Sequence, residues 1–241
     1  MTERFEEIKE NAFNIYNQFM KTLSNKDKVA ITRCISSMVY AIENNFTLID
    51  PLEIVSMFRI SYPSWYMDVK TLFRQYYSIV GRENVNYCEV GRKLELERYE
   101  TPEEIGIISI VSFDSKNKPA GRINYNEHDG LFVVMIPKNN IILSTFIVAH
   151  EIAHLITNKL GIYDIEGDSE SKEIAVEMAS DYFAVFVYCR LTHITDKKQK
   201  ENLLNMLKTI AQKDEGLYET NEMQIRQLHI SQIVDTIFPE T

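Results

Sequence analysis

Cysteine, glycine and proline are all scarce in this chain. Its 241 residues include only three cysteines, Cys34, Cys88 and Cys189, which lie far apart and never form a C-x-x-C pair. This pattern excludes a disulfide framework and a zinc site built from thiolates, so we interpret the cysteines as buried thiols. Because there are only eight glycines and six prolines, little interrupts regular structure, and we expect long helices.

Long apolar segments and an excess of positive charge are also missing. No apolar run approaches the ~20 residues that span a bilayer, and the first residues, MTERFEEIKE, lack the apolar region of a signal peptide. We therefore predict a cytoplasmic protein with no membrane partner. The formal net charge of −9 gives no electrostatic reason to bind phosphate backbones, so direct nucleic-acid binding is not expected.

The length allows one good core with a small helical subdomain. We predict a helical N-terminal region (1–100), a core (101–195) and C-terminal helices (196–241). In the first region, apolar residues recur every three to four positions, which predicts helices over Phe5–Leu23, Lys28–Asn44, the segment after Asp50, and Asp68–Ile79. A tight link at 61–64 faintly resembles a helix-turn-helix, but the following segment is aromatic and poor in basic residues, which favours simple packing.

The middle of the chain changes to short β-branched segments separated by turn signals. Strands are predicted over Ile105–Asp114, Ala120–Asn126 and Leu131–Pro137, as consecutive antiparallel neighbours. His128, in the last turn, has no ligand spacing around it and is interpreted as a solvated loop residue. The predicted fold class is α+β: mainly helical, with a small antiparallel or mixed sheet packed on the helix that follows.

Four helices are predicted after the strands. The first runs from Ile141 to Leu160 and closes at Gly161, and the second begins near Ser169 or Ser171 and runs to Leu191. Two further amphipathic helices cover about Lys197–Gln212 and Asn221–Phe238.

The first of these helices carries the string VAHEIAHL, in which His150 and His154 are four positions apart and Glu151 directly follows the first. Residues four apart share one helix face, so both imidazoles can reach one metal ion while the glutamate stands beside it. The alternative is a chance string on an ordinary core helix. A metal site needs a further protein ligand, which the string itself does not contain.

The second helix supplies that ligand. It is nearly all apolar from Ile174 to Cys189, and its polar interruptions Glu177, Ser180 and Asp181 fall at i, i+3 and i+4. A buried carboxylate needs a cation or a metal, which predicts Glu177 as the third ligand and Asp181 as acceptor of the distal N–H of His150. The alternatives are Glu173, one turn earlier near the helix start, and a polar stripe that merely faces solvent.

These residues predict one zinc ion per chain with an open fourth position, and peptide hydrolysis as the reaction class. Glu151, adjacent to a ligand but not a ligand itself, is predicted to be the general base. Candidates for stabilising the oxyanion are Tyr163, Tyr182 and His193, chosen by proximity in sequence, and for each tyrosine simple packing is the favoured interpretation.

From about Gly121 to Leu191 the sequence resembles the ImmA/IrrE-type zinc metallopeptidases of bacteria and their mobile elements. The likeness rests on FIVAHEIAHLI followed by EMASDYFAVFV, which is similar to the family pattern E-x-x-A-[N/D]-x-F-A. Three features depart from the family: Ser180 replaces a small apolar residue, Ala153 stands where glycine is frequent, and the ending LLMP is missing.

The resemblance implies a zincin-like fold with the same ligands and base. It also implies that the segment Leu131–Ile136 is an edge strand that binds the substrate as an added strand, and that the substrate is a repressor-like regulatory protein. The alternatives are a non-catalytic binding module stabilised by zinc, which the intact Glu151 disfavours, and a transcription regulator.

Overall fold

The structure is a computed structural model that describes residues 2–44, 90–98, 101–113, 122–126, 131–137, 141–162 and 168–192, together with Arg74, 201–203, Asn205, His229 and Ile233. Residue contacts divide the chain into two compact units, one formed by Met1–Asn25 with Thr145–Thr241 and the other by Lys26–Ser144. These units do not follow the three successive ranges predicted from the sequence, because the N-terminal helix associates with the C-terminal half of the chain.

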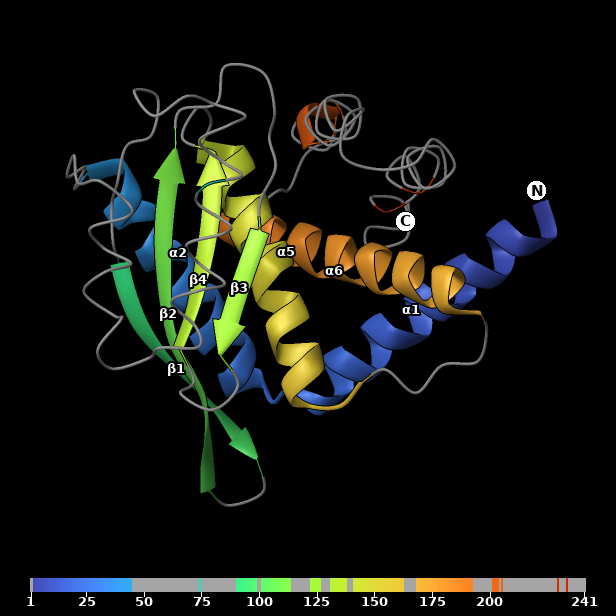
Figure 1. The fold of residues 1–241 in the computed structure, drawn as a ribbon, viewed down its shortest axis with the longest axis horizontal. Coiled ribbons are helices and arrows are strands. Elements are labelled where there is room, and N and C mark those ends of the chain that lie inside the picture. The colour runs from blue at the N-terminus through green and yellow to red at the C-terminus, as the bar shows by residue number, and fades with distance from the viewer. Residues whose placement is uncertain are drawn as a thin grey trace. The chain divides into compact units, whose positions relative to one another are not determined.

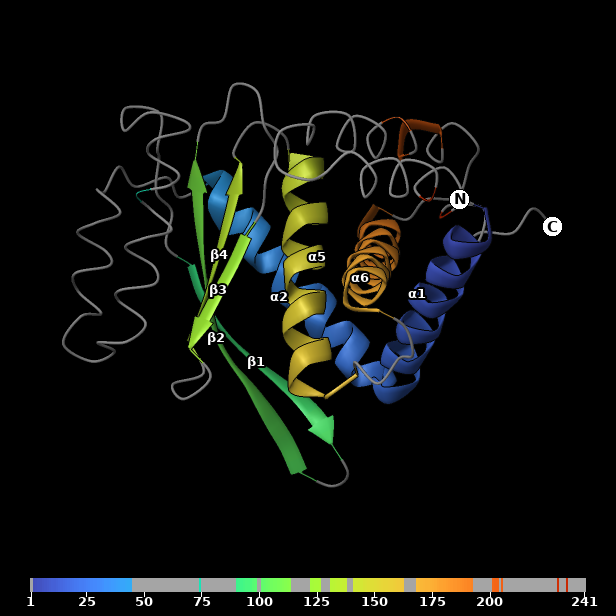
Figure 2. The same cartoon turned by 45° about the vertical axis from the view of Figure 1, so that its right-hand side comes forward.

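The first unit contains three long helices. They are α1 (Thr2–Thr22), α5 (Ile141–Lys159, of which the unit takes the part from Thr145) and α6 (Ser169–Thr192). Figures 1 and 2 show α6 beside both other helices. Most described residues of the chain are helical and the remainder form a small sheet, so the predicted mainly helical α+β class is confirmed.

Aromatic side chains join α1 to α6. The rings of Phe19 and Phe183 meet edge to face with centroids 4.6 Å apart, and Tyr16 lies 5.4 Å from Tyr182. Both Phe19 and Phe183 are 1% exposed, and edge-to-face pairs of this kind add about 0.5–1.5 kcal/mol to the free energy of burial. Helix α1 is thus a structural support for α6.

Helix α5 is buried along almost its whole length. Every described side chain from Thr145 to Thr157 is buried except His154. The helix ends where Gly161 takes a positive φ of 65° and the Ile162 amide donates to the Thr157 carbonyl at 3.0 Å, as in a Schellman motif. The predicted stop at Gly161 is confirmed.

Helix α6 begins with a side-chain cap. Asp168 accepts the Ser171 amide at 2.9 Å and the Ser171 hydroxyl at 2.8 Å, which satisfies a donor that a helix start leaves without an internal partner. Arg4 of α1 forms an ion pair at 2.7 Å with Glu170, which lies in the same first turn of α6. The hydrogen bonds from Ser171, followed by the charge of Arg4, lower the pKa of Asp168 below 3.8.

Replacing Asp168 with Ala should lower the melting temperature by about 2–4 °C at pH 7, because the cap of α6 is lost. A lowered pKa in the folded state means that the carboxylate stabilises the protein above the unfolded pKa, and that this contribution is lost as the pH falls through the folded pKa. The melting temperatures of wild type and variant should therefore approach each other as the pH falls below the ordinary pKa of an aspartate and on through the lowered pKa of Asp168. An equal difference at pH 3 and pH 7 would contradict the capping role.

The second unit contains α2 (Asn25–Asn44, of which it takes the part from Lys26) and the sheet. The carboxylate of Asp27, in the first turn of α2, accepts the backbone N–H of Glu97 at 2.7 Å. Asp27 is 2% exposed, so this hydrogen bond is a buried link between the helix and the strand that carries Glu97.

That strand, β1 (Val90–Arg98), was not predicted and lies within the range predicted to be helical. Its sequence alternates, with Leu94 and Leu96 buried and Lys93, Glu95 and Glu97 exposed. Leu, Lys and Glu favour helices in isolation, but the period of two fits a half-buried strand and pairing with the next strand decides the outcome.

The sheet has four strands in the order β1-β2-β4-β3 (Figure 1). The others are β2 (Thr101–Phe113), β3 (Arg122–Asn126) and β4 (Leu131–Pro137). The prediction of consecutive antiparallel neighbours was wrong: β4 inserts between β2 and β3, pairing with β2 in parallel and with β3 antiparallel. Direction does alternate along the chain, but spatial order does not follow it, so the sheet is mixed.

The expectation that 131–136 forms an edge strand was also wrong. Residues Leu131–Met135 pair with β2 on one side and with β3 on the other, so their backbone groups are already used and cannot accept a further strand. The edges of the described sheet are β1 and β3.

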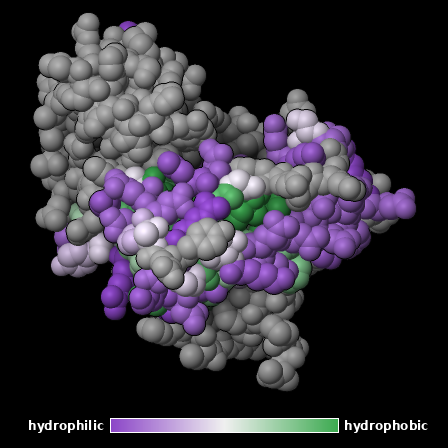
Figure 3. All heavy atoms as spheres, turned by 90° about the horizontal axis from the view of Figure 1, so that it is seen from below, coloured by the Kyte–Doolittle hydropathy of each residue, from purple (hydrophilic) through white to green (hydrophobic). Residues whose placement is uncertain are grey.

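Several predictions fall outside the described residues: the helix after Asp50, the link at 61–64, His128, Cys88, and most of the helices over 68–79, 197–212 and 221–238. Cys189 is buried and Cys34 is half-buried, both as thiols. Within the described part of the chain, no helix is long and apolar enough to cross a membrane. On the face in Figure 3, the coloured residues are mainly hydrophilic, with small hydrophobic areas.

Candidate metal centre

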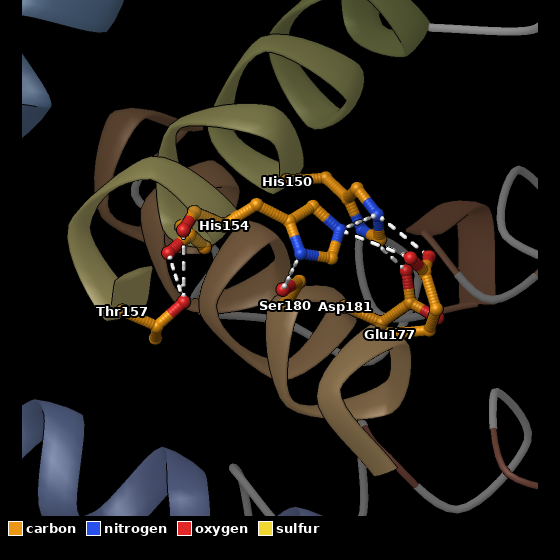
Figure 4. A network of polar contacts seen from close by, with 7 residues as sticks. His150, His154, Thr157, Glu177, Ser180 and Asp181 are labelled. Carbon is orange, nitrogen blue, oxygen red and sulfur yellow. Dashed lines mark hydrogen bonds and ion pairs between the residues drawn. The ribbon is translucent and has the colours of Figure 1, made fainter. Parts of the chain in front are cut away.

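Two imidazoles on consecutive turns of α5 begin the site. The Nε2 atoms of His150 and His154 lie 2.9 Å apart, with the ring planes at 76° to each other. Figure 4 shows both rings pointing from α5 toward α6. The spacing of four residues therefore places both rings on one face of the helix, as the sequence predicted.

Glu177 of α6 completes the group. Its Oε2 lies 3.1 Å from His150 Nε2 and its Oε1 lies 3.2 Å from His154 Nε2, so one carboxylate faces both imidazoles (Figure 4). The rival ligand Glu173 is exposed and is not part of this group. The choice of Glu177 over Glu173 agrees with the geometry.

These three groups fit a metal ion. Ligands at 2.0–2.1 Å around a tetrahedral centre are separated by about 3.3 Å. The two Nε2 atoms here are 2.9 Å apart, and each lies 3.1 or 3.2 Å from a different oxygen of Glu177, so the three side chains are close enough to share one ion. Two nitrogens and one carboxylate oxygen can hold a metal ion at this position. Such a donor set suits zinc and also other divalent transition metals, so the geometry indicates a metal site without fixing the element.

The site is more exposed on its Glu177 side. The side chain of His150 is 9% exposed, that of His154 19%, and that of Glu177 26%. The group is therefore only partly enclosed, and Glu177 is its most exposed member. A fully closed structural site would need a fourth protein donor, and no fourth His, Cys, Asp or Glu joins the group among the residues described.

Asp181 lies behind His150, as the sequence predicted. Its Oδ1 is 2.9 Å from His150 Nδ1, and its side chain is 0% exposed. A carboxylate at the distal nitrogen keeps a proton on Nδ1, so Nε2 is the atom that would bind a metal ion. This contact also offsets the free-energy cost of burying the Asp181 carboxylate completely.

The imidazoles and carboxylates of the site shift each other's pKa values. Burial lowers the pKa of His150, but the contacts with Asp181 and Glu177 outweigh it and raise the pKa from 6.5 to about 10. Burial raises the pKa of Glu177, but the charges and hydrogen bonds of His154 and His150 lower it well below 4.5. A metal ion bound at Nε2 of His150 would therefore take the place of a proton.

Replacing Asp181 with Asn should lower metal affinity about 10- to 100-fold, the usual cost of losing a partner behind a ligating imidazole. The amide oxygen can still accept the Nδ1 proton, but the negative charge that makes His150 a stronger ligand is gone. Zinc affinity measured by competition with a chromophoric chelator tests this. Unchanged affinity would show that Asp181 serves only the packing of α6.

Glu151 lies on α5 directly after His150 and one turn before His154, and it is 8% exposed. Its assignment as the general base stays a prediction.

The candidates for stabilising an oxyanion receive no support. Tyr182 is 1% exposed, and its ring packs against Phe13, Tyr16 and His229 at centroid distances of 6.0, 5.4 and 4.6 Å. It therefore belongs to the aromatic core, as the alternative interpretation held. Tyr163 and His193 lie outside the described residues.

Sequence reasoning noted Ser180 as a polar interruption but gave it no role at the site. Its hydroxyl lies 3.4 Å from Nδ1 of His154, on the side of the ring opposite the converging Nε2 atoms (Figure 4). Two features of the sequence could have indicated that Ser180 lies at the site: it follows Glu177 by three positions, and it directly precedes Asp181.

Comparison of the chain with protein-family models, with curated proteins and with solved structures finds no match. The case for this metal centre therefore rests on the geometry of its own residues.

Proposed function

We propose that this protein is a zinc-dependent metallopeptidase. The observation that carries the proposal is the convergence of two imidazoles and a carboxylate from α5 and α6 within hydrogen-bond distance of one another. Asp181 orients one imidazole from behind, and Glu151 lies in the same helix turn as the ligands. The arrangement agrees with the zincin-like core that the resemblance implies, and that core is part of the proposal.

His150, His154 and Glu177 would hold the ion. Bound zinc supplies Lewis acidity, which polarises a peptide carbonyl and makes water a better nucleophile near neutral pH. Glu151 then removes a proton from the attacking water and delivers it to the leaving amine as the C–N bond breaks. Asp181 keeps the Nδ1 proton on His150, so that this ligand neither rotates nor changes tautomer.

The proposed substrate is a repressor-like regulatory protein in a stress or mobile-element circuit. This part rests on the resemblance of 121–191 to ImmA/IrrE-type peptidases. With a formal net charge of −9, the chain is suited to act on a protein rather than on nucleic acid.

A non-catalytic zinc-stabilised module is the second candidate. It is favoured by one observation, which is that the ligands join α5 to α6, so a bound ion would link two buried helices. Against it stand the three-residue donor set and the buried Glu151, because a purely structural site needs a fourth donor and no base.

The direct test incubates the purified chain with the repressor-like protein encoded beside its gene, once after zinc loading and once after chelation. We expect one dominant cut in the zinc-loaded sample, located by intact-mass spectrometry, and none after chelation. Zinc content is measured in both samples, so that a wrong substrate is distinguished from an unloaded enzyme. A zinc-loaded protein that cuts neither this partner nor an unfolded protein would favour the structural role.

A further inference from the structure

Ser180 is buried and its hydroxyl faces a metal ligand. The residue is 2% exposed, and its Oγ lies 3.4 Å from Nδ1 of His154 (Figure 4). A buried hydroxyl costs free energy unless it finds a hydrogen-bond partner. The partner therefore indicates what this serine does inside an otherwise apolar helix.

Several other hydroxyl groups in the described helices have a different partner. Four threonines donate to the carbonyl four residues earlier in their own helix, at 2.7–2.8 Å: Thr22, Thr32, Thr157 and Thr192. That bond is the ordinary way to satisfy a helical hydroxyl. For Ser180, the polar contact shown among the described residues is instead with His154 Nδ1, and the tautomer of the imidazole decides which of the two atoms donates.

We propose that Ser180 is a positioning residue for His154, an inference that rests on the proposed metal site. Its oxygen accepts the Nδ1 proton of the imidazole and thereby leaves the Nε2 lone pair for the metal. The consecutive residues Ser180 and Asp181 then serve the two imidazoles of α5, one each.

The two side chains that contact the distal nitrogens, Asp181 and Ser180, differ in charge. Asp181 presents a carboxylate to His150 at 2.9 Å, whereas Ser180 presents a neutral hydroxyl to His154 at 3.4 Å. A charged acceptor makes a shorter and stronger hydrogen bond and a more basic ligand. The contact of Ser180 with His154 is therefore the weaker of the two, and its effect falls at the lower end of the range for such partners.

The test compares Ser180→Ala with Ser171→Ala in the full chain. Ser171 is a matched control because it is also a buried serine of α6, but its hydroxyl bonds to Asp168 and Arg4 rather than to an imidazole. Zinc affinity is measured by chelator competition. We expect about a 10-fold loss for Ser180→Ala and a change of less than twofold for Ser171→Ala.

A spectroscopic measurement separates positioning from general destabilisation. In the zinc-loaded protein, the Nδ1 proton of His154 should exchange faster with water and shift upfield in Ser180→Ala, while that of His150 stays unchanged. Equal zinc affinity and an unmoved His154 signal would overturn the inference although the metal site stands. A wild-type protein that binds no zinc would overturn the proposed function as well, so the two failures are distinguishable.

Discussion

Replacing Glu177 with Gln is expected to leave the protein without stoichiometric zinc, whereas Glu173→Gln should keep one ion per chain. The amide cannot supply the anionic oxygen that faces both His150 Nε2 and His154 Nε2. Two neutral imidazoles bind zinc far more weakly than a set of three donors. The loss should therefore exceed the roughly 10- to 100-fold typical of a partner behind a ligand, as measured by metal analysis after dialysis against a weak chelator.

Glu173→Gln is the matched control because it makes the same chemical change one turn earlier on α6, at an exposed position. Thermal melting of both metal-free variants shows whether either change disturbs the helix itself. Zinc retained in Glu177→Gln, or lost in Glu173→Gln, would contradict the assignment of the third ligand. No zinc in the wild type would reject the metal site altogether.

The helices of the site could be predicted because their signals are local. The spacing of His150 and His154, the stop at Gly161 and the start of α6 near Ser169 each depend on a few neighbouring residues. A pattern with a period near 3.6 fixes which side chains share a face. The partner helix was predicted by a different argument, namely that a carboxylate in an apolar stripe needs a cation.

The role of Ser180 could not be predicted in the same way. Periodicity placed it on the face of Glu177, but whether its hydroxyl turns to its own helix or to His154 depends on the register between α5 and α6. That register is set by packing along both helices, such as the complete burial of Asp181 and Ile152. A single sequence carries no direct record of it.

The prediction of the sheet was wrong for a related reason. The direction of each strand follows from the short turns, but the insertion of β4 between β2 and β3 is a pairing between segments that are distant in sequence. Strand β1 was missed because its leucines, lysine and glutamates favour a helix until pairing with β2 and the hydrogen bond from Glu97 to Asp27 override that preference. Tertiary contacts, not local propensity, decided both outcomes.

Replacing Glu151 with Gln is expected to leave zinc content unchanged and to reduce cleavage about 10²- to 10⁴-fold, the usual contribution of a positioned base. Gln has the same shape as Glu and can fill the same buried position on α5, but it cannot accept a proton from water or return one to the leaving amine.

The measurement is the rate of appearance of the cut product from the repressor-like substrate at saturating zinc, with Glu173→Gln as a control for the same chemical change away from the ligands. Metal analysis of each sample accompanies the rates. Cleavage by Glu151→Gln at the wild-type rate would make another group the base, and loss of its zinc would make Glu151 part of the metal site. Full zinc occupancy with cleavage lost distinguishes a residue that acts in the reaction from a ligand, which would lose both, and from a packing residue, which would lose neither.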